Sequence, residues 1–124
     1  MMKFTFSKKD KIKSRTQIQT LFAQGKSMNN KPLRAVYYSN PSLGNDLKIG
    51  VSVSKKYFKK AVDRNYIKRL LREAYRKNQY QIKEAHSKPN LIMFLYQSHK
   101  IPSYADLEAK MIDLLEKLVQ DSKI

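Results

Sequence analysis

Apolar residues recur along this chain at two spacings, one typical of helices and one typical of strands. Three segments repeat them every three or four residues, as an amphipathic helix requires. Another segment alternates apolar and polar residues, and two more are short runs rich in β-branched and aromatic residues, which indicates strands. In chain order, the patterns predict a helix at residues 14–24, strands at 32–39 and 47–54, a helix at 60–78, a strand at 91–96 and a helix at 104–119.

The order α-β-β-α-β-α, with room for one extra short strand, predicts an α+β fold. We expect a small two-layer sandwich in which the helices pack on one central β-sheet. The run at residues 91–96 does not alternate, so it is predicted to be a central strand covered on both faces. Turn formers at residues 40–46 indicate that the second strand runs antiparallel to the first. The 124 residues suit one domain, at 13–124, preceded by a flexible basic arm at 1–12.

The helix predicted at residues 60–78 has two faces of different character. At about 100° per residue, its apolar stripe consists of Ile67, Leu70, Leu71 and Ala74, and its polar arc of Arg64, Asn65, Lys68, Arg69, Arg72 and Arg76. A helix face exposed only to solvent usually alternates the sign of its charges. Here Asp63 and Glu73 are the only acids between residues 59 and 76, so we expect this arc to lie along phosphates.

The overall charge favours the same interpretation. The chain has 26 Lys and Arg against 10 Asp and Glu, and residues 1–60 hold 14 of the bases and two of the acids. One strongly positive side is the electrostatic footprint of a nucleic-acid binder. The chain contains no cysteine, and no apolar run approaches the ~20 residues of a membrane span. Its first residues also lack an apolar signal segment, so we expect a cytoplasmic protein with no membrane partner.

The residues that could perform chemistry are few and scattered. The two histidines, His86 and His99, have no partner at a recognisable motif spacing, and the three glycines form no phosphate-binding loop. Four carboxylates fall on the last predicted helix, where a solvated face is their usual role: Asp106, Glu108, Asp113 and Glu116. We therefore expect no catalytic residue, no metal site, no cofactor bound by the protein alone and no small-molecule substrate.

Three segments give the chain a resemblance to the protein component of bacterial ribonuclease P, over roughly residues 6–119. They are the strand end at residues 51–56 (VSVSKK), the basic helix at 60–73 (KAVDRNYIKRLLRE), and the basic start followed by residues 18–22 (IQTLF) and Gly25. The resemblance implies a protein without nuclease activity of its own. It would bind a large catalytic RNA that removes the 5′ leader from precursor tRNA with Mg²⁺ held by the RNA. It also implies a left-handed βαβ crossover.

The resemblance assigns the polar arc of the basic helix to contacts with the catalytic RNA. The family commonly has Arg-Asn-Arg where this chain has Arg64, Asn65 and Tyr66. Tyr66 lacks the third guanidinium. It could stack on an exposed base, but its place at the border of the two faces favours packing, and we expect it to pack.

The resemblance also implies a cleft between the first helix and the sheet that binds the precursor's leader. The residues that match it are Ile18, Phe22, Val36, Tyr38, Ser52, Ser54, Lys55 and Lys56. Ile18 stands where the family often has Phe, and an aliphatic side chain cannot stack on a base as an aromatic ring can. Without the resemblance, core packing would be the better explanation of Ile18 and Phe22.

Two other classes of function stay open. A ribosomal or RNA-assembly protein of similar fold would bind RNA without a processing partner. An autonomous metal-dependent nuclease would cleave RNA by itself and would depend on a carboxylate. A helix-turn-helix DNA binder fits less well, because the basic helix is predicted between strands and no short helix precedes it.

Overall fold

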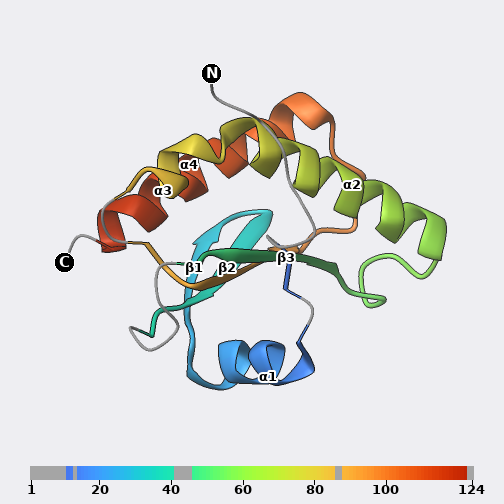
Figure 1. Cartoon of the computed structure of the whole chain (residues 1–124). Helices are drawn as coiled ribbons and strands as arrows, with labels where there is room; N and C mark the ends of the chain where they lie inside the picture. The colour runs from blue at the N-terminus through green and yellow to red at the C-terminus, as the bar shows by residue number, and fades with distance from the viewer. Residues whose placement is uncertain (1–10, 13, 41–45, 86–87, 123–124) are drawn as a thin grey trace.

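The fold is a mixed β-sheet with helices on both faces, seen in a computed structural model that describes residues 11–12, 14–40, 46–85 and 88–122. Its elements are α1 (Arg15–Gln24), β1 (Lys26–Asn30), β2 (Leu33–Tyr38), β3 (Lys48–Val53), α2 (Ala61–Asn78), α3 (Tyr80–Lys83), β4 (Leu91–Tyr96) and α4 (Tyr104–Ser122). In Figure 1, α2, α3 and α4 lie over one face of the sheet and α1 lies under the other. The α+β class is confirmed, and β1 is the extra short strand.

The strand order β1-β2-β4-β3 places β4 in the interior of the sheet. β4 pairs antiparallel with β2 and parallel with β3. β2 and β3 therefore run in opposite directions, as expected, but they are not neighbours, because the wholly apolar β4 is inserted between them. The parallel pair is joined through α2, as a parallel connection requires. The left-handedness of this crossover stays a prediction from the resemblance.

Alternate residues of β4 belong to two separate cores. Ile92 and Phe94 pack into the larger core under α2 and α4, whereas Leu91 and Met93 pack with Leu21 of α1 into the smaller one. This explains why the strand shows no polar alternation: both of its faces are covered. The apolar stripe of α4 lies in the larger core and consists of Leu107, Met111, Leu114, Leu115 and Leu118.

The position of α1 is fixed at both of its ends. Ser14 is the N-cap, and its side chain accepts a hydrogen bond from the Gln17 backbone N–H at 3.2 Å. At the other end, the Gly25 N–H donates to the Leu21 carbonyl at 2.8 Å. A Cβ at Gly25 would lie 2.8 Å from the Tyr37 carbonyl oxygen, so only glycine lets the end of α1 approach the backbone of β2 this closely.

The end of the expected N-terminal arm is attached to the sheet. Lys11 forms an isolated parallel bridge with Ile49, and the Ile12 N–H donates to the Ile49 carbonyl at 2.9 Å. Ile12 also packs against the smaller core. Lys11 and Ile12 therefore lie against the sheet, and residues 1–10 lie outside the described part of the chain, so the flexible arm at 1–12 stays a prediction. None of the helices described here combines the length and hydrophobicity that a membrane span needs.

Candidate nucleic-acid interface

Helix α2 divides into a buried side and an exposed side as its sequence predicts. Ile67, Leu71 and Ala74 are completely buried, and Tyr75 joins them. Leu70, predicted for the same stripe, is half-buried and packs against the larger core. Asp63 in the first turn and Lys77 in the last turn suit the helix dipole. Burial of this stripe fixes which side of α2 faces outward.

The outward side of α2 carries an exposed basic strip, which we define as Asn65, Lys68, Arg69 and Arg72. Asn65, Arg69 and Arg72 are exposed and Lys68 is half-exposed. Within the described part of the chain, no carboxylate pairs with any of the three bases. Like charges three and four residues apart destabilise an isolated helix slightly. A ligand rich in phosphate would relieve this repulsion.

Arg64 has a different role from the basic strip. Its Nη1 donates to the Phe58 carbonyl at 2.9 Å and to the Lys59 carbonyl at 2.8 Å. The guanidinium therefore holds the connection between β3 and α2 against the first turns of the helix. This internal contact was not visible in the sequence, because it depends on how the preceding loop folds back.

Arg76 is engaged with a carboxylate on the same helix. Its Nε donates to Glu73 Oε2 at 3.1 Å, its Nη2 pairs with Oε1, and Lys77 Nζ lies 3.8 Å from the same Oε1. The hydrogen bond from Arg76, aided by the charges of Arg76 and Lys77, lowers the pKa of Glu73 below its usual value. The C-terminal end of the predicted arc is thus partly neutralised within the protein.

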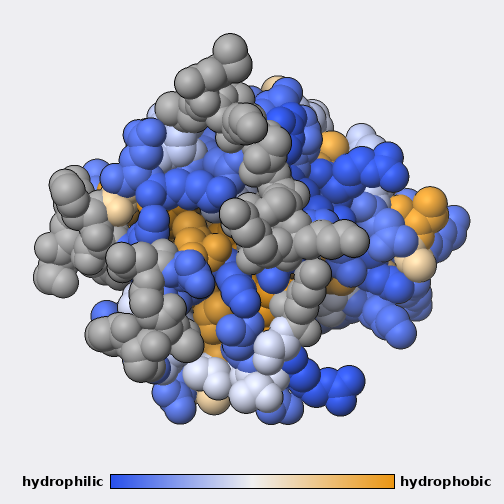
Figure 2. Space-filling model, in the orientation of Figure 1, coloured by the Kyte–Doolittle hydropathy of each residue, from blue (hydrophilic) through white to orange (hydrophobic). Residues whose placement is uncertain are grey.

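Tyr66 does not pack in the core, so that expectation was wrong. Its side chain is 46% exposed, and Val62, one turn earlier, is 70% exposed. Tyr66 is followed by the buried Ile67, and an offset of one residue turns a helical side chain about 100° away. Val62 and Tyr66 are four residues apart on the helix, so the two exposed side chains are neighbours and form an apolar patch beside the basic strip. Figure 2 shows that this side of the molecule is mostly blue, with a small orange area at the right.

On the opposite face of the sheet, the residues assigned to the leader cleft differ in how much surface they present. Phe22 is 51% exposed, whereas Val36 is 4% exposed and forms part of the floor under α1. Ile18 and Tyr38 are half-buried against the smaller core. A hollow of about 200 Å³ lies beside α1, and it is lined by Gln17, Asp46, Lys48, Asn90 and Leu91.

The pairing register adds one basic residue to this face that the sequence reasoning missed. Arg34 of β2 lies opposite Leu95 of β4, which in turn lies opposite Ser52 of β3. Direct cross-strand partners point to the same side of a sheet, so these three residues form one row on the α1 face. Arg34 could have been found from its spacing, because it is two residues before Val36 and therefore shares its face.

The strand-end residues of the cleft assignment lie in the turn after β3. Ser54 Oγ accepts a hydrogen bond from the Lys56 backbone N–H at 3.1 Å, so this hydroxyl shapes the turn. Lys55 and Lys56 are exposed, and Lys56 Nζ lies 5.6 Å from the centre of the Tyr57 ring. Exposed lysines at a strand end can contact phosphate oxygens without reading sequence.

The structure separates the two predicted RNA-binding sets rather than combining them. The basic strip belongs to the layer of α2 on one side of the sheet, and α1 with its neighbours lies on the other side (Figure 1). Residues 54–60 connect the two sides. Over the described ranges, no three His, Asp or Glu side chains come together as a metal-ligand set. His99 is exposed, and the centre of its ring lies 5.0 Å from that of the Tyr57 ring, with the two ring planes tilted by 60°. His86 lies outside the described residues.

Comparisons of the sequence and of the structure with known proteins agree on one family. The sequence model of the family Ribonuclease P matches residues 6–119. The chain is 35% identical over 116 residues to a ribonuclease P protein component of Porphyromonas gingivalis, covering 87% of this chain and 82% of that protein. It is 36% identical over 110 residues to the ribonuclease P protein component of Clostridium botulinum strain 657, covering 89% and 95%.

Solved structures agree with the sequence relatives. The RNase P protein from Thermotoga maritima superimposes with a TM-score of 0.71 at 25% identity, covering 86% of this chain and 96% of that one. The Staphylococcus aureus RNase P protein has a TM-score of 0.69 at 23% identity, covering 93% and 96%. The second likeness concerns the fold alone.

Proposed function

Because this chain belongs to the ribonuclease P protein family, whose members are RNA-binding components of a tRNA-processing endoribonuclease, we propose that it binds the catalytic RNA through α2 and the precursor's leader through the α1 face. In this proposal the RNA carries the reaction, and the protein binds and positions. No side chain of the protein acts as general acid, general base or nucleophile.

The observation that carries the proposal is the basic strip. Arg69 and Arg72 are exposed on a helix whose other side packs in the larger core, so the helix is held in place while their guanidinium groups are open to a ligand. Guanidinium groups bind phosphate in a bidentate manner. The apolar patch of Val62 and Tyr66 beside them adds a surface on which an unpaired base can stack.

The opposite face supports a separate role in holding single-stranded leader. Phe22 presents half of its side chain, as a stacking platform requires. Arg34 on the same face and the exposed Lys55 and Lys56 in the turn after β3 supply positive charge. Contacts of this kind bind the backbone and the faces of bases, so we expect little dependence on leader sequence.

Mg²⁺ enters the proposal through the RNA. The protein would lower the repulsion between the phosphates of the two RNAs where they approach each other, and Mg²⁺ ions would then bind to the RNA more readily. No step requires a metal ion held by a side chain of this protein.

The decisive experiment measures cleavage of a precursor tRNA at low Mg²⁺ with the source organism's ribonuclease P RNA alone, with this protein alone and with both. We expect efficient cleavage at the mature 5′ end only when both are present. Cleavage by the protein alone would indicate an autonomous nuclease. Absence of stimulation would contradict the subunit role, and the same protein would then be tested for tight binding to ribosomal RNA.

A second experiment tests the basic strip itself. The double variant Arg69→Ala/Arg72→Ala should fold normally, bind the catalytic RNA more weakly, and show a plot of log affinity against log salt that is shallower by about two. Lys117→Ala, on an exposed position of α4, is the matched control and should change neither quantity. Equal effects of the two changes would show that RNA responds to net charge and not to this strip.

A further inference from the structure

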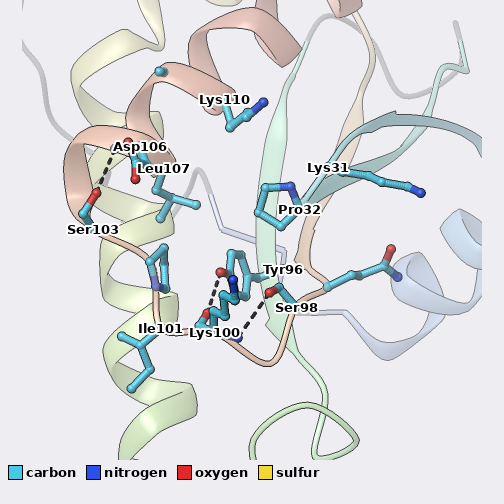
Figure 3. Close-up of a pocket in the computed structure, with 13 residues that line it drawn as sticks. Lys31, Pro32, Tyr96, Ser98, Lys100, Ile101, Ser103, Asp106, Leu107 and Lys110 are labelled. Carbon is cyan, nitrogen blue, oxygen red and sulfur yellow. Dashed lines mark hydrogen bonds between the residues drawn. The ribbon is translucent and has the colours of Figure 1, made fainter.

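A second hollow of the molecule is lined by none of the residues of the basic strip or the leader cleft. It has a volume of about 670 Å³ and is bounded by the turn between β1 and β2, the loop that follows β4, and the first half of α4. Figure 3 shows Asp106 and Lys110 of α4 on one side and Pro32 and Lys31 of the turn on the other. The volume lies within the range of small-ligand pockets, roughly 300–1,000 Å³.

The three walls of this hollow are tied together by hydrogen bonds. Asn30 Nδ2 donates to the Lys110 carbonyl at 3.0 Å, and the Gln97 N–H donates to the Pro32 carbonyl at 2.8 Å. Within the loop, the Tyr96 hydroxyl donates to the Lys100 carbonyl at 2.6 Å. The pocket is therefore formed before any ligand arrives, which lowers the entropy lost on binding.

The lining combines an apolar floor with groups for hydrogen bonding. Leu107 and Tyr96 are buried at the base, Pro32 and Pro102 are half-exposed, and Ile101 stays 54% exposed at the rim. The polar side chains in the lining are those of Gln97, Ser98, Ser103 and Asp106. A ligand that has a flat ring with polar groups at its edges suits such a lining better than simple ions or a purely apolar ligand.

The charges around the hollow have both signs. Lys31, Lys100 and Lys110 contribute three ammonium groups, and in the part of the chain that the structure describes none of them pairs with a carboxylate. Asp106 is exposed, and no described side chain pairs with its carboxylate. The lysines favour an anionic group, whereas the Asp106 carboxylate, one helical turn before Lys110, accepts hydrogen bonds from hydroxyl or amino groups.

We propose that this hollow is a binding site for a single ribonucleotide, with the base on the apolar floor, the phosphate at the lysines and a ribose hydroxyl donating to Asp106. A bare phosphate would leave the floor unused and would be repelled by Asp106. A deoxyribonucleotide would lack the 2′-hydroxyl, the group that lets a protein distinguish RNA from DNA. The source of the nucleotide is either an unpaired residue of an RNA chain or a free nucleotide.

The proposal does not depend on the ribonuclease P role, because the lining contains no residue of the basic strip and none of those assigned to the leader cleft. It can be tested with free AMP, in the absence of any ribonuclease P RNA. Failure of AMP to bind would leave the cleavage experiment above unaffected, and a failed cleavage experiment would leave this site untouched.

The experiment is a titration of the isotope-labelled full-length protein with AMP, followed by two-dimensional NMR of its backbone amides. We expect saturable shifts confined to residues 31–32, 96–103 and 106–110, and weaker binding of deoxy-AMP. Inorganic phosphate should not reproduce the pattern. The same saturable shifts with inorganic phosphate would reduce the site to an anion site and overturn the proposal.

Helix α4 offers matched variants seven residues apart. Lys110→Ala should raise the dissociation constant for AMP about three- to tenfold, whereas Lys117→Ala should leave it unchanged. Asp106→Ala should remove the preference for AMP over deoxy-AMP, and Asp113→Ala should retain it. Unaltered spectra away from the changed residue will show that each variant is folded. Equal weakening by both lysine changes would indicate unspecific attraction and would contradict the site.

A competition experiment distinguishes the two sources of the nucleotide, an unpaired residue of an RNA chain and a free nucleotide. If a five-nucleotide single-stranded RNA displaces AMP and shifts the same amides, the pocket accepts an unpaired residue of a chain. If AMP stays bound while the oligonucleotide binds elsewhere, the pocket accepts the free nucleotide. Either result supports a ribonucleotide site. The absence of saturable shifts with both probes would overturn the proposal.

Discussion

The two faces of the sheet use the same strands for different purposes. On one face, Ile92, Phe94 and Tyr96 of β4 are covered by α2, α3 and α4 and are almost completely excluded from water. On the other face, Leu91 and Met93 are buried by the ten-residue α1, but Leu95 stays half-exposed. One helix is too small to cover a sheet of this width.

The difference separates stability from binding. The covered face has most of its apolar surface sealed under α2, α3 and α4, so its main contribution is to the stability of the fold. The α1 face keeps Phe22 and the row of Arg34, Leu95 and Ser52 accessible beside a small core. Binding residues on an incompletely covered face are held by the core on the other side of the same strands.

The largest expected effect comes from two neighbouring residues of β4. Phe94→Ala should lower the free energy of unfolding by about 3–5 kcal/mol, because Phe94 is completely buried in the larger core. Leu95→Ala should lower it by only about 1 kcal/mol. Urea denaturation of both variants measures the difference. Equal losses of stability would mean that the two faces contribute equally to the free energy of unfolding, which would contradict the difference described above.

Phe22 provides the converse test on the α1 face. Phe22→Ala should leave the urea midpoint nearly unchanged but weaken binding of a single-stranded leader RNA by about 1–3 kcal/mol, the range for loss of one stacked base. Phe22→Tyr, which keeps an aromatic ring, should bind as the parent does. Fluorescence anisotropy with a labelled leader gives the affinity. A lowered midpoint with unchanged affinity would assign Phe22 to packing.

Arg64 and Arg69 should respond differently although both belong to the predicted arc. Arg64→Ala removes two hydrogen bonds to backbone carbonyls and should destabilise the fold by about 1–2 kcal/mol. Arg69→Ala, exposed and without a partner among the described residues, should stay within about 0.5 kcal/mol of the parent. Thermal unfolding measures both. If Arg64→Ala proves neutral, its contacts with the loop do not matter for stability.

The smallest effect concerns Glu73. Glu73→Gln removes the carboxylate that pairs with Arg76 and Lys77, so affinity for the catalytic RNA should rise about two- to threefold, with a salt dependence steeper by about one unit. The Glu73 pKa is lowered from 4.5, so the carboxylate stays charged, and the gain persists, until the pH falls below that lowered pKa. Below it, parent and variant should converge. A gain that is independent of pH would contradict this explanation.

The sequence predicted what depends on local pattern. The apolar stripe of α4 and the burial of β4 on both faces follow from the spacing or content of apolar residues. Insertion of β4 between β2 and β3 could not be predicted this way, because turn formers report on chain direction and not on which strands pair. The internal role of Arg64 depends on a loop conformation that no periodicity describes. Exposure of Tyr66 depends on a single step around the helix, where the apolar and polar sectors meet.

The strand order has a consequence for synthesis of the protein. β4 lies between β2 and β3 but follows them by more than thirty residues in the chain, so during translation the first three strands emerge without the strand that joins them. Until β4 has left the ribosome, the backbone groups along one edge of β2 and of β3 lack their hydrogen-bond partners. The larger core also lacks the side chains of β4. Ribosomes add about 5–20 residues per second, so the nascent chain passes through an interval of seconds in which these edges could pair with other chains. The excess of basic over acidic residues, 14 against two in residues 1–60, then opposes association of one unfinished chain with another before the fold is complete.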